Sequence, residues 1–140
     1  MEEWDIKTIL LAYDGSEEAE KAAHLAWEVA ARRDARVVVL SAFRPGSAIQ
    51  SDIDVVGRRV IEARERAEAM VEELARMGVE GEADVAQGPA AGAILNAAAF
   101  CGADLIVMGG RKRNPFAKLL SRSTSKRVLR QATTPVLVAR

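Results

Sequence analysis

The stretch IKTILLAYDGS, residues 6–16, decides the fold class of this 140-residue chain. Residues 6–13 form a nearly continuous apolar run, which is typical of a strand buried on both faces of a parallel sheet. The run ends at a short polar turn, and Ser16 follows as a suitable cap for a helix with an acidic first turn. The stretch therefore predicts a buried strand that leads directly into a helix.

Strand and helix patterns continue to alternate along the rest of the chain. Apolar runs predict further strands at residues 36–43, 79–87, 104–109 and 135–139, and helices are expected to begin near residues 16, 54, 89 and 123. The strand at 79–87 alternates with acidic residues, as an edge strand would. Strands that alternate with helices form a parallel sheet with right-handed crossovers and helices on both faces. We therefore expect a single doubly wound α/β domain over residues 1–140.

In a doubly wound sheet, ligands bind beyond the carboxyl ends of the strands, where the strand order reverses. Two turns are candidates for this place: residues 14–16 after the first strand and residues 109–112 after the fourth. The last helix begins with hydroxyl side chains and has no acid near its start, so its N-terminus is suited to phosphate. We expect a nucleotide to place its base and sugar toward Asp14 and its phosphates toward Ser123.

The overall charge of the chain is zero, but the charges are unevenly distributed. Residues 1–104 hold 11 Lys and Arg against 20 Asp and Glu, whereas residues 105–140 hold nine Lys and Arg and no acid. This asymmetry favours an anion-facing surface formed by the second of these segments. Nucleic acid is not the expected partner, because the basic stretch carries no recognised reading motif.

The composition argues against several classes of protein. Cys101 is the only cysteine, which rules out an internal disulfide and fits the reducing cytoplasm. Because His24 is the only histidine, no zinc-type metal site is expected. The chain begins without a signal-peptide pattern and has no apolar run long enough to span a bilayer, so a cytoplasmic protein is expected. Neither GxxxxGKS/T nor GxGxxG occurs, and no nucleophile, base and orienting group are grouped together, so no dedicated enzyme is expected.

Four stretches taken together resemble the universal stress protein family. They are ILLAYDGS at residues 9–16, Gly88-Pro89, ADLIVMG at residues 103–109 and TPVLV at residues 134–138. The resemblance covers nearly the whole chain. It implies the strand order 3-2-1-4-5 of the adenine-nucleotide alpha-hydrolase-like fold. It also implies a cytoplasmic regulatory homodimer that acts by binding and partner interaction, formed by antiparallel pairing of the last strands at Val136, Leu137 and Val138.

The resemblance also implies a nucleotide site. ATP-binding members carry the pattern G-x2-G-x9-G-S/T after the fourth strand, and here Lys112 and Arg122 stand at the second and third glycine positions. The family's contacts to adenine and ribose fall on the first two strands, and its contacts to phosphate fall on the start of the last helix. With their neighbours, the candidate nucleotide-binding residues are Ala12, Tyr13, Asp14, Ala42, Met108, Gly109, Arg111, Lys112, Arg122, Ser123, Thr124 and Ser125.

The two glycine replacements have opposing consequences for ATP. A long side chain obstructs the close approach of the backbone to phosphate and disfavours positive φ, at a cost of about 1 kcal/mol or more. A charge-assisted contact to phosphate contributes roughly 1.5–3 kcal/mol. We favour a phosphate loop that does not hold ATP tightly. The alternative is an ATP-binding switch, with ATP or AMP and Mg²⁺, in which Lys112, Arg122 and residues 123–125 hold the phosphates.

Asp14 also has two interpretations. Its carboxylate is suited to accept hydrogen bonds from a ribose or a base, and it is equally suited to cap the turn before the first helix.

Overall fold

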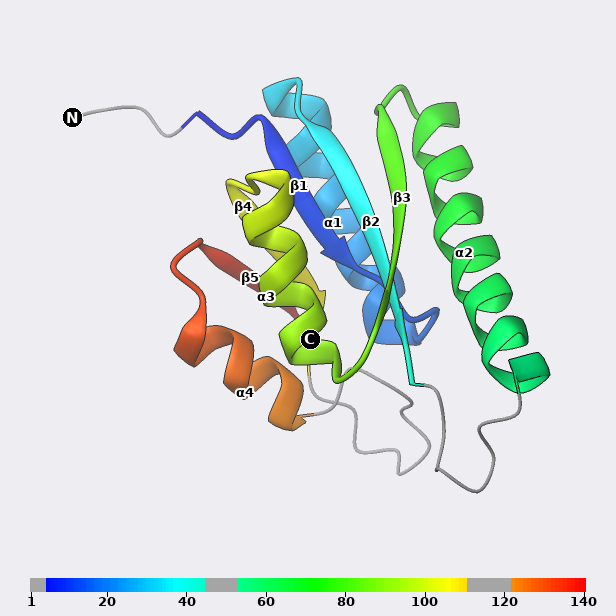
Figure 1. Ribbon diagram of the computed structural model, residues 1–140. Coiled ribbons are helices and arrows are strands. Elements are labelled where there is room, and N and C mark those ends of the chain that lie inside the picture. The colour runs from blue at the N-terminus through cyan, green and yellow to red at the C-terminus, as the bar shows by residue number, and fades with distance from the viewer. Residues whose placement is uncertain (1–4, 45–52, 111–121) are drawn as a thin grey trace.

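The computed structural model describes residues 5–44, 53–110 and 122–140. Within them, one parallel sheet has the strand order β3-β2-β1-β4-β5 and is flanked by helices (Figure 1). The strands are β1 (Thr8–Ala12), β2 (Arg36–Phe43), β3 (Gly81–Gln87), β4 (Leu105–Gly109) and β5 (Val136–Ala139). The helices are α1 (Glu17–Arg33), α2 (Ile53–Arg76), α3 (Ala90–Cys101) and α4 (Arg122–Gln131). The predicted doubly wound α/β fold and its strand order are confirmed.

The two faces of the sheet carry separate apolar clusters, because successive side chains of a strand point to opposite faces. On one face, Ile9 and Leu11 of β1 pack with alanines of α1 and with α2. On the other face, Leu10 and Ala12 pack with α3 and α4. All five residues of β1 are buried, as expected for a central strand covered by helices on both faces.

The turn after β1 forms as the sequence predicts. The Ser16 hydroxyl accepts a hydrogen bond from the backbone N–H of Ala19 at 3.2 Å, which makes Ser16 the N-cap of α1. The buried face of α1 consists of alanines, so the helix lies close to the sheet. This turn places Asp14 directly beyond the carboxyl end of β1.

Asp104 lies directly before β4 and bonds to the backbone at the start of β1. Its Oδ2 atom accepts hydrogen bonds from the backbone N–H groups of Lys7 and Thr8, at 2.9 and 3.0 Å. These bonds fix the start of β1 beside the start of β4. The side chain therefore has a structural role at the end of the sheet opposite to the candidate site.

The remaining elements differ from the predictions only at their ends. α2 is followed by Gly78 at a φ of +82°, a conformation that favours glycine. The sequence pattern predicts Pro89 in the first turn of this helix. In the structure Pro89 is the N-cap of α3, one residue before the first turn. β3 lies at one edge of the sheet, as predicted, and β5 lies at the other. Within the described part of the chain, no helix is both long and apolar enough to cross a membrane.

Candidate functional site

The strand order reverses at β1, which pairs with β2 on one side and with β4 on the other. At its carboxyl end, Ala12 is in register with Leu40 of β2 and with Met108 of β4. The turns after β1 and β4 therefore leave the sheet at the same edge, as expected for a ligand site in this fold. The described start of α4 lies at this end of the sheet as well (Figure 1).

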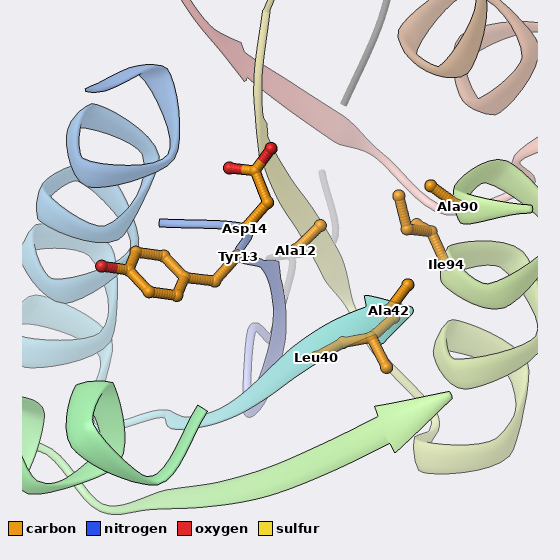
Figure 2. Close-up of a pocket in the computed structure, with 7 residues that line it drawn as sticks. All are labelled: Ala12, Tyr13, Asp14, Leu40, Ala42, Ala90 and Ile94. Atoms are coloured by element: carbon orange, nitrogen blue, oxygen red, sulfur yellow. The ribbon is translucent and has the colours of Figure 1, made fainter. Parts of the chain in front are cut away.

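A small pocket lies at this edge, on the side of the sheet that α3 covers (Figure 2). Seven residues line it: Ala12, Tyr13, Asp14, Leu40, Ala42, Ala90 and Ile94. They come from the ends of β1 and β2, from the following turn, and from the first two turns of α3. Ala12, Asp14 and Ala42, which the family resemblance assigns to base and ribose, are thus brought together in one hollow.

Three of the lining residues are not predicted by the sequence patterns. Leu40 lies two positions before Ala42 in β2 and shares its face of the sheet, so strand periodicity is a signal that could have found it. Ala90 and Ile94 belong to α3, about fifty residues further along the chain. Their place in the pocket depends on how the crossover helix packs over the sheet, for which a single sequence carries no local signal.

The pocket has apolar walls and a carboxylate at its rim. In Figure 2, Ala42, Ala90 and Ile94 face one hollow, and the Asp14 side chain stands at its edge. Such a combination is suited to an uncharged ring and a hydroxyl donor. The cavity volume is about 10 Å³, roughly the space that one water molecule requires. A nucleobase therefore enters only if α3 or the rim moves outward.

Asp14 is half-buried and already has one role in the turn. Its Oδ1 atom accepts a hydrogen bond from the backbone N–H of Ser16 at 2.9 Å. The capping interpretation of Asp14 is therefore correct. A carboxylate has two oxygens and can accept several hydrogen bonds, so this bond is compatible with a second role toward a ligand.

Tyr13 borders the pocket, but its ring points away from it toward α1 (Figure 2). The Tyr13 hydroxyl donates a hydrogen bond to Oε1 of Glu20, on the opposite face of the sheet. Burial of the ring raises the pKa of Tyr13 well above its usual value, and the hydrogen bond and negative charge of Glu20 raise it further. The phenol thus remains protonated, and its side chain belongs to the α1 and α2 layer.

At the end of β4, Met108 and Gly109 are both buried. The Met108 side chain lies in the apolar cluster with Ile94 and Val128 and does not line the pocket. A Cβ atom added at Gly109 would lie 2.9 Å from Cβ of Glu18 and 3.0 Å from the backbone carbonyl carbon of Glu18. The close approach of α1 therefore requires a glycine here.

The phosphate half of the predicted site is described only in part. α4 already includes Arg122 and Ser123, so Ser123 itself is not the N-cap. The sequence predicts that Ser123 or a neighbour caps this helix, and the residue before Arg122 lies outside the described residues. Thr124 and Ser125 are buried, Ser123 is exposed, and none of the three lines the pocket. Arg111, Lys112 and the side chain of Arg122 lie outside the described residues.

Within residues 5–44, 53–110 and 122–140, no group of three or more His, Cys, Asp or Glu side chains is placed to hold a metal ion. His24 lies on α1 beside Trp27, and its Nε2 atom is 3.6 Å from Oε1 of Glu28. Burial raises the pKa of the Cys101 thiol, which therefore has little thiolate character. Neither residue lies near the pocket lining.

The strand order, the switch point and the pocket define a protein of the adenine-nucleotide alpha-hydrolase-like fold. The sequence model of the universal stress protein family matches residues 5–140, and the chain belongs to that family. A universal stress protein of Thermus aquaticus is 40% identical over 137 residues, which are 96% of this chain and 98% of that protein.

Two solved structures show the same likeness. A universal stress protein of Archaeoglobus fulgidus is 30% identical, with a TM-score of 0.74 over 96% of this chain and 98% of that chain. A universal stress protein of the same organism, solved in complex with dAMP, is 26% identical, with a TM-score of 0.71 over 99% and 100% of the two chains.

Proposed function

We propose that this protein is a cytoplasmic regulatory homodimer that acts by binding and partner interaction, and that its altered phosphate loop does not hold ATP tightly. Its ligand is an adenine nucleotide bound through base and ribose in the pocket beside Asp14. The observation that carries this proposal is the convergence of Ala12, Asp14 and Ala42 on one apolar hollow at the switch point of the sheet. The protein performs no dedicated catalytic reaction.

The composition of the pocket supports base and ribose as the recognised parts. Apolar side chains from β2 and α3 are suited to an adenine ring, and the Asp14 carboxylate is suited to the hydroxyl groups of a ribose. A related protein was solved with dAMP, a nucleotide with one phosphate. A nucleotide with one phosphate needs fewer contacts from the phosphate loop than ATP does.

Gly109 gives no independent support for ATP binding. It is the one glycine that remains of the three in the family's phosphate pattern, but contact with α1 explains it without any ligand. The other two positions carry Lys112 and Arg122, whose side chains obstruct the backbone approach that glycine permits. We therefore expect the second and third phosphates to add little affinity.

A second candidate function is an ATP-binding switch. It is favoured by the hydroxyl residues Ser123, Thr124 and Ser125 in the first described turn of α4, at the edge of the sheet where the pocket lies. In that case Lys112 and Arg122 replace backbone contacts to phosphate with charged side-chain contacts.

Calorimetric titration with AMP and with ATP and Mg²⁺ separates the two functions. We expect AMP to bind with a Kd on the order of 1 mM, which corresponds to about 4 kcal/mol, and ATP to bind within about threefold of AMP. Asp14→Ala should weaken AMP binding about tenfold or more, because a hydrogen bond to a charged group is lost. Asp5→Ala, which removes an exposed carboxylate before β1, is the matched control and should bind as the unmodified protein does.

A second variant separates the role of Asp14 in the turn from its role toward the ligand. Asp14→Asn keeps an oxygen that accepts from the N–H of Ser16 but removes the negative charge. Weaker AMP binding in this variant, with an unchanged circular dichroism spectrum, supports a ligand contact. Micromolar ATP binding that is lost in the variant with glycine at positions 112 and 122 would instead support the switch.

A further inference from the structure

A second hollow lies between the end of β2 and the first half of α2. Because α2 and α3 cover opposite faces of the sheet (Figure 1), this hollow lies on the other side of β2 from the nucleotide pocket. It is lined by residues 42–44 and by one face of α2, with Arg59, Glu62, Ala63 and Arg66 at helical spacing. Its volume is about 460 Å³, within the roughly 300–1,000 Å³ typical of small-molecule sites. The hollow is therefore large enough for a small organic ligand.

Two guanidinium groups of the hollow are held in place by hydrogen bonds. Nη1 of Arg66 donates to the hydroxyl of Ser41 at 2.9 Å, and Ser41 is fully buried. Nη1 of Arg59 donates to the backbone carbonyl of Arg44 at 2.5 Å. Both arginine side chains are half-buried. Because a guanidinium has five N–H donors, each group keeps further donors for another acceptor.

The described lining residues of the hollow carry an excess of positive charge. They include Arg44, Arg59 and Arg66 and one carboxylate, that of Glu62. Among the described side chains, no ion pair within 4.0 Å joins Glu62 to any of these arginines. Arginine remains charged at every physiological pH, so the three groups repel one another and attract an anion.

We propose that this hollow is a binding site for a small organic phosphate, separate from the pocket beside Asp14. Arginine forks match the geometry of phosphate oxygens and form paired, charge-assisted hydrogen bonds with them. Phe43 and Ala63 supply an apolar wall for the organic part of the ligand. The two hollows share only Ala42 among their described lining residues, so a ligand in one does not occupy the other.

Phenyl phosphate, which joins an aromatic ring to a phosphate dianion, is a suitable probe. Calorimetric titration at constant ionic strength is expected to give saturable binding, tighter than that of inorganic phosphate because of the apolar wall. Arg59→Gln and Arg66→Gln should each raise the Kd of phenyl phosphate about tenfold or more, since a charge-assisted contact is lost. Arg58→Gln removes an equal charge from an exposed neighbour on α2 that does not line the hollow, and its Kd should stay within about twofold.

The site is distinguished from the nucleotide pocket by Asp14→Asn, which should leave phenyl phosphate binding unchanged even if it weakens AMP binding. Arg66→Gln removes the hydrogen bond to the buried Ser41 and could therefore disturb the fold. Arg59 makes no bond to Ser41, so Arg59→Gln tests the site in that case. The proposal is overturned if phenyl phosphate does not bind up to about 10 mM, or if Arg59→Gln and Arg58→Gln weaken it equally. Binding retained in both Arg59→Gln and Arg66→Gln would also overturn it, since the phosphate would then lie elsewhere.

Discussion

At Gly109, the packing of the protein and a motif for ligand binding require the same residue type. A Cβ atom there would meet the backbone of α1, with the N atom of Ala19 at 3.1 Å in addition to the Glu18 atoms. Backbone atoms cannot rotate away as the end of a flexible side chain can. A glycine at this position is therefore needed for α1 to lie against β4, whether or not a nucleotide binds.

We expect Gly109→Ala to lower the free energy of unfolding by about 1–3 kcal/mol, because α1 must shift to admit the methyl group. Gly92→Ala is the matched control, since an added Cβ at this helical position meets no atom within 4 Å. That variant should be neutral or more stable by about 0.5–1 kcal/mol. Urea unfolding followed by circular dichroism measures both, and an equal loss in the two variants would contradict the packing argument.

Tyr13 is the only tyrosine of the chain, so the absorbance of tyrosinate reports on this residue alone. Its pKa is raised in the folded protein, chiefly by burial. The folded state therefore keeps its proton at a pH where the unfolded chain has lost it. The stability linked to this group is complete below the unfolded pKa of about 10 and is lost as the pH rises above it.

A spectrophotometric titration tests this directly. Tyrosinate should form well above pH 10 in the folded protein, and near pH 10 in protein unfolded by urea. Tyr13→Phe should reduce the loss of stability between about pH 9 and pH 11, measured by urea unfolding. A midpoint at the usual value in the folded protein would show that the phenol is accessible to solvent and that the described hydrogen bond to Glu20 has no effect on its proton.

At the scale of elements, β5 forms an apolar edge of the sheet. Among the described strands it pairs only with β4, and residues Val136, Leu137 and Val138 are half-buried at the edge of the sheet. An apolar edge with unpaired backbone groups is a template for pairing with a second strand. Antiparallel pairing of two β5 strands would produce a two-fold symmetric dimer, as the homodimer hypothesis requires.

Leu137→Lys is expected to convert this dimer to a monomer, because it places two like charges close to the two-fold axis of the paired strands. Sedimentation velocity measures the change. Leu129→Lys, at an exposed leucine of α4, is the matched control and should remain dimeric. A folded Leu137→Lys protein that still sediments as a dimer would exclude this interface, and Val136→Lys provides an independent second test.

At the scale of the whole molecule, the end of β2 separates two hollows of different chemistry. On the α3 side, Leu40 and Ala42 line a small apolar pocket with the Asp14 carboxylate at its rim. On the α2 side, Ser41 holds Arg66 at the margin of a larger and positively charged hollow. The alternation of side chains along one strand thus gives the protein two distinct surfaces within a few residues.

The local pattern of the chain was enough to predict its strands, helices and fold class. Apolar runs predict β2 with its observed bounds, and Ser16 caps α1 as predicted. The charged edge strand predicted at 79–87 is present as β3, which begins two residues later, at Gly81. Each of these features depends on residues only a few positions apart, and a sequence displays such spacing directly. The strand order, by contrast, was predicted from resemblance to a family.

The site was predictable only where its residues lie on the first two strands. Ala12, Asp14 and Ala42 meet as expected, but the wall formed by Ala90 and Ile94 and the direction of the Tyr13 ring were not foreseen. The packing reason for Gly109 and the grouping of Arg59 and Arg66 with the end of β2 also emerged only from the folded chain. These features depend on which helix packs against which strand. The crossovers bring together residues that are far apart in the sequence, and no local periodicity predicts such contacts.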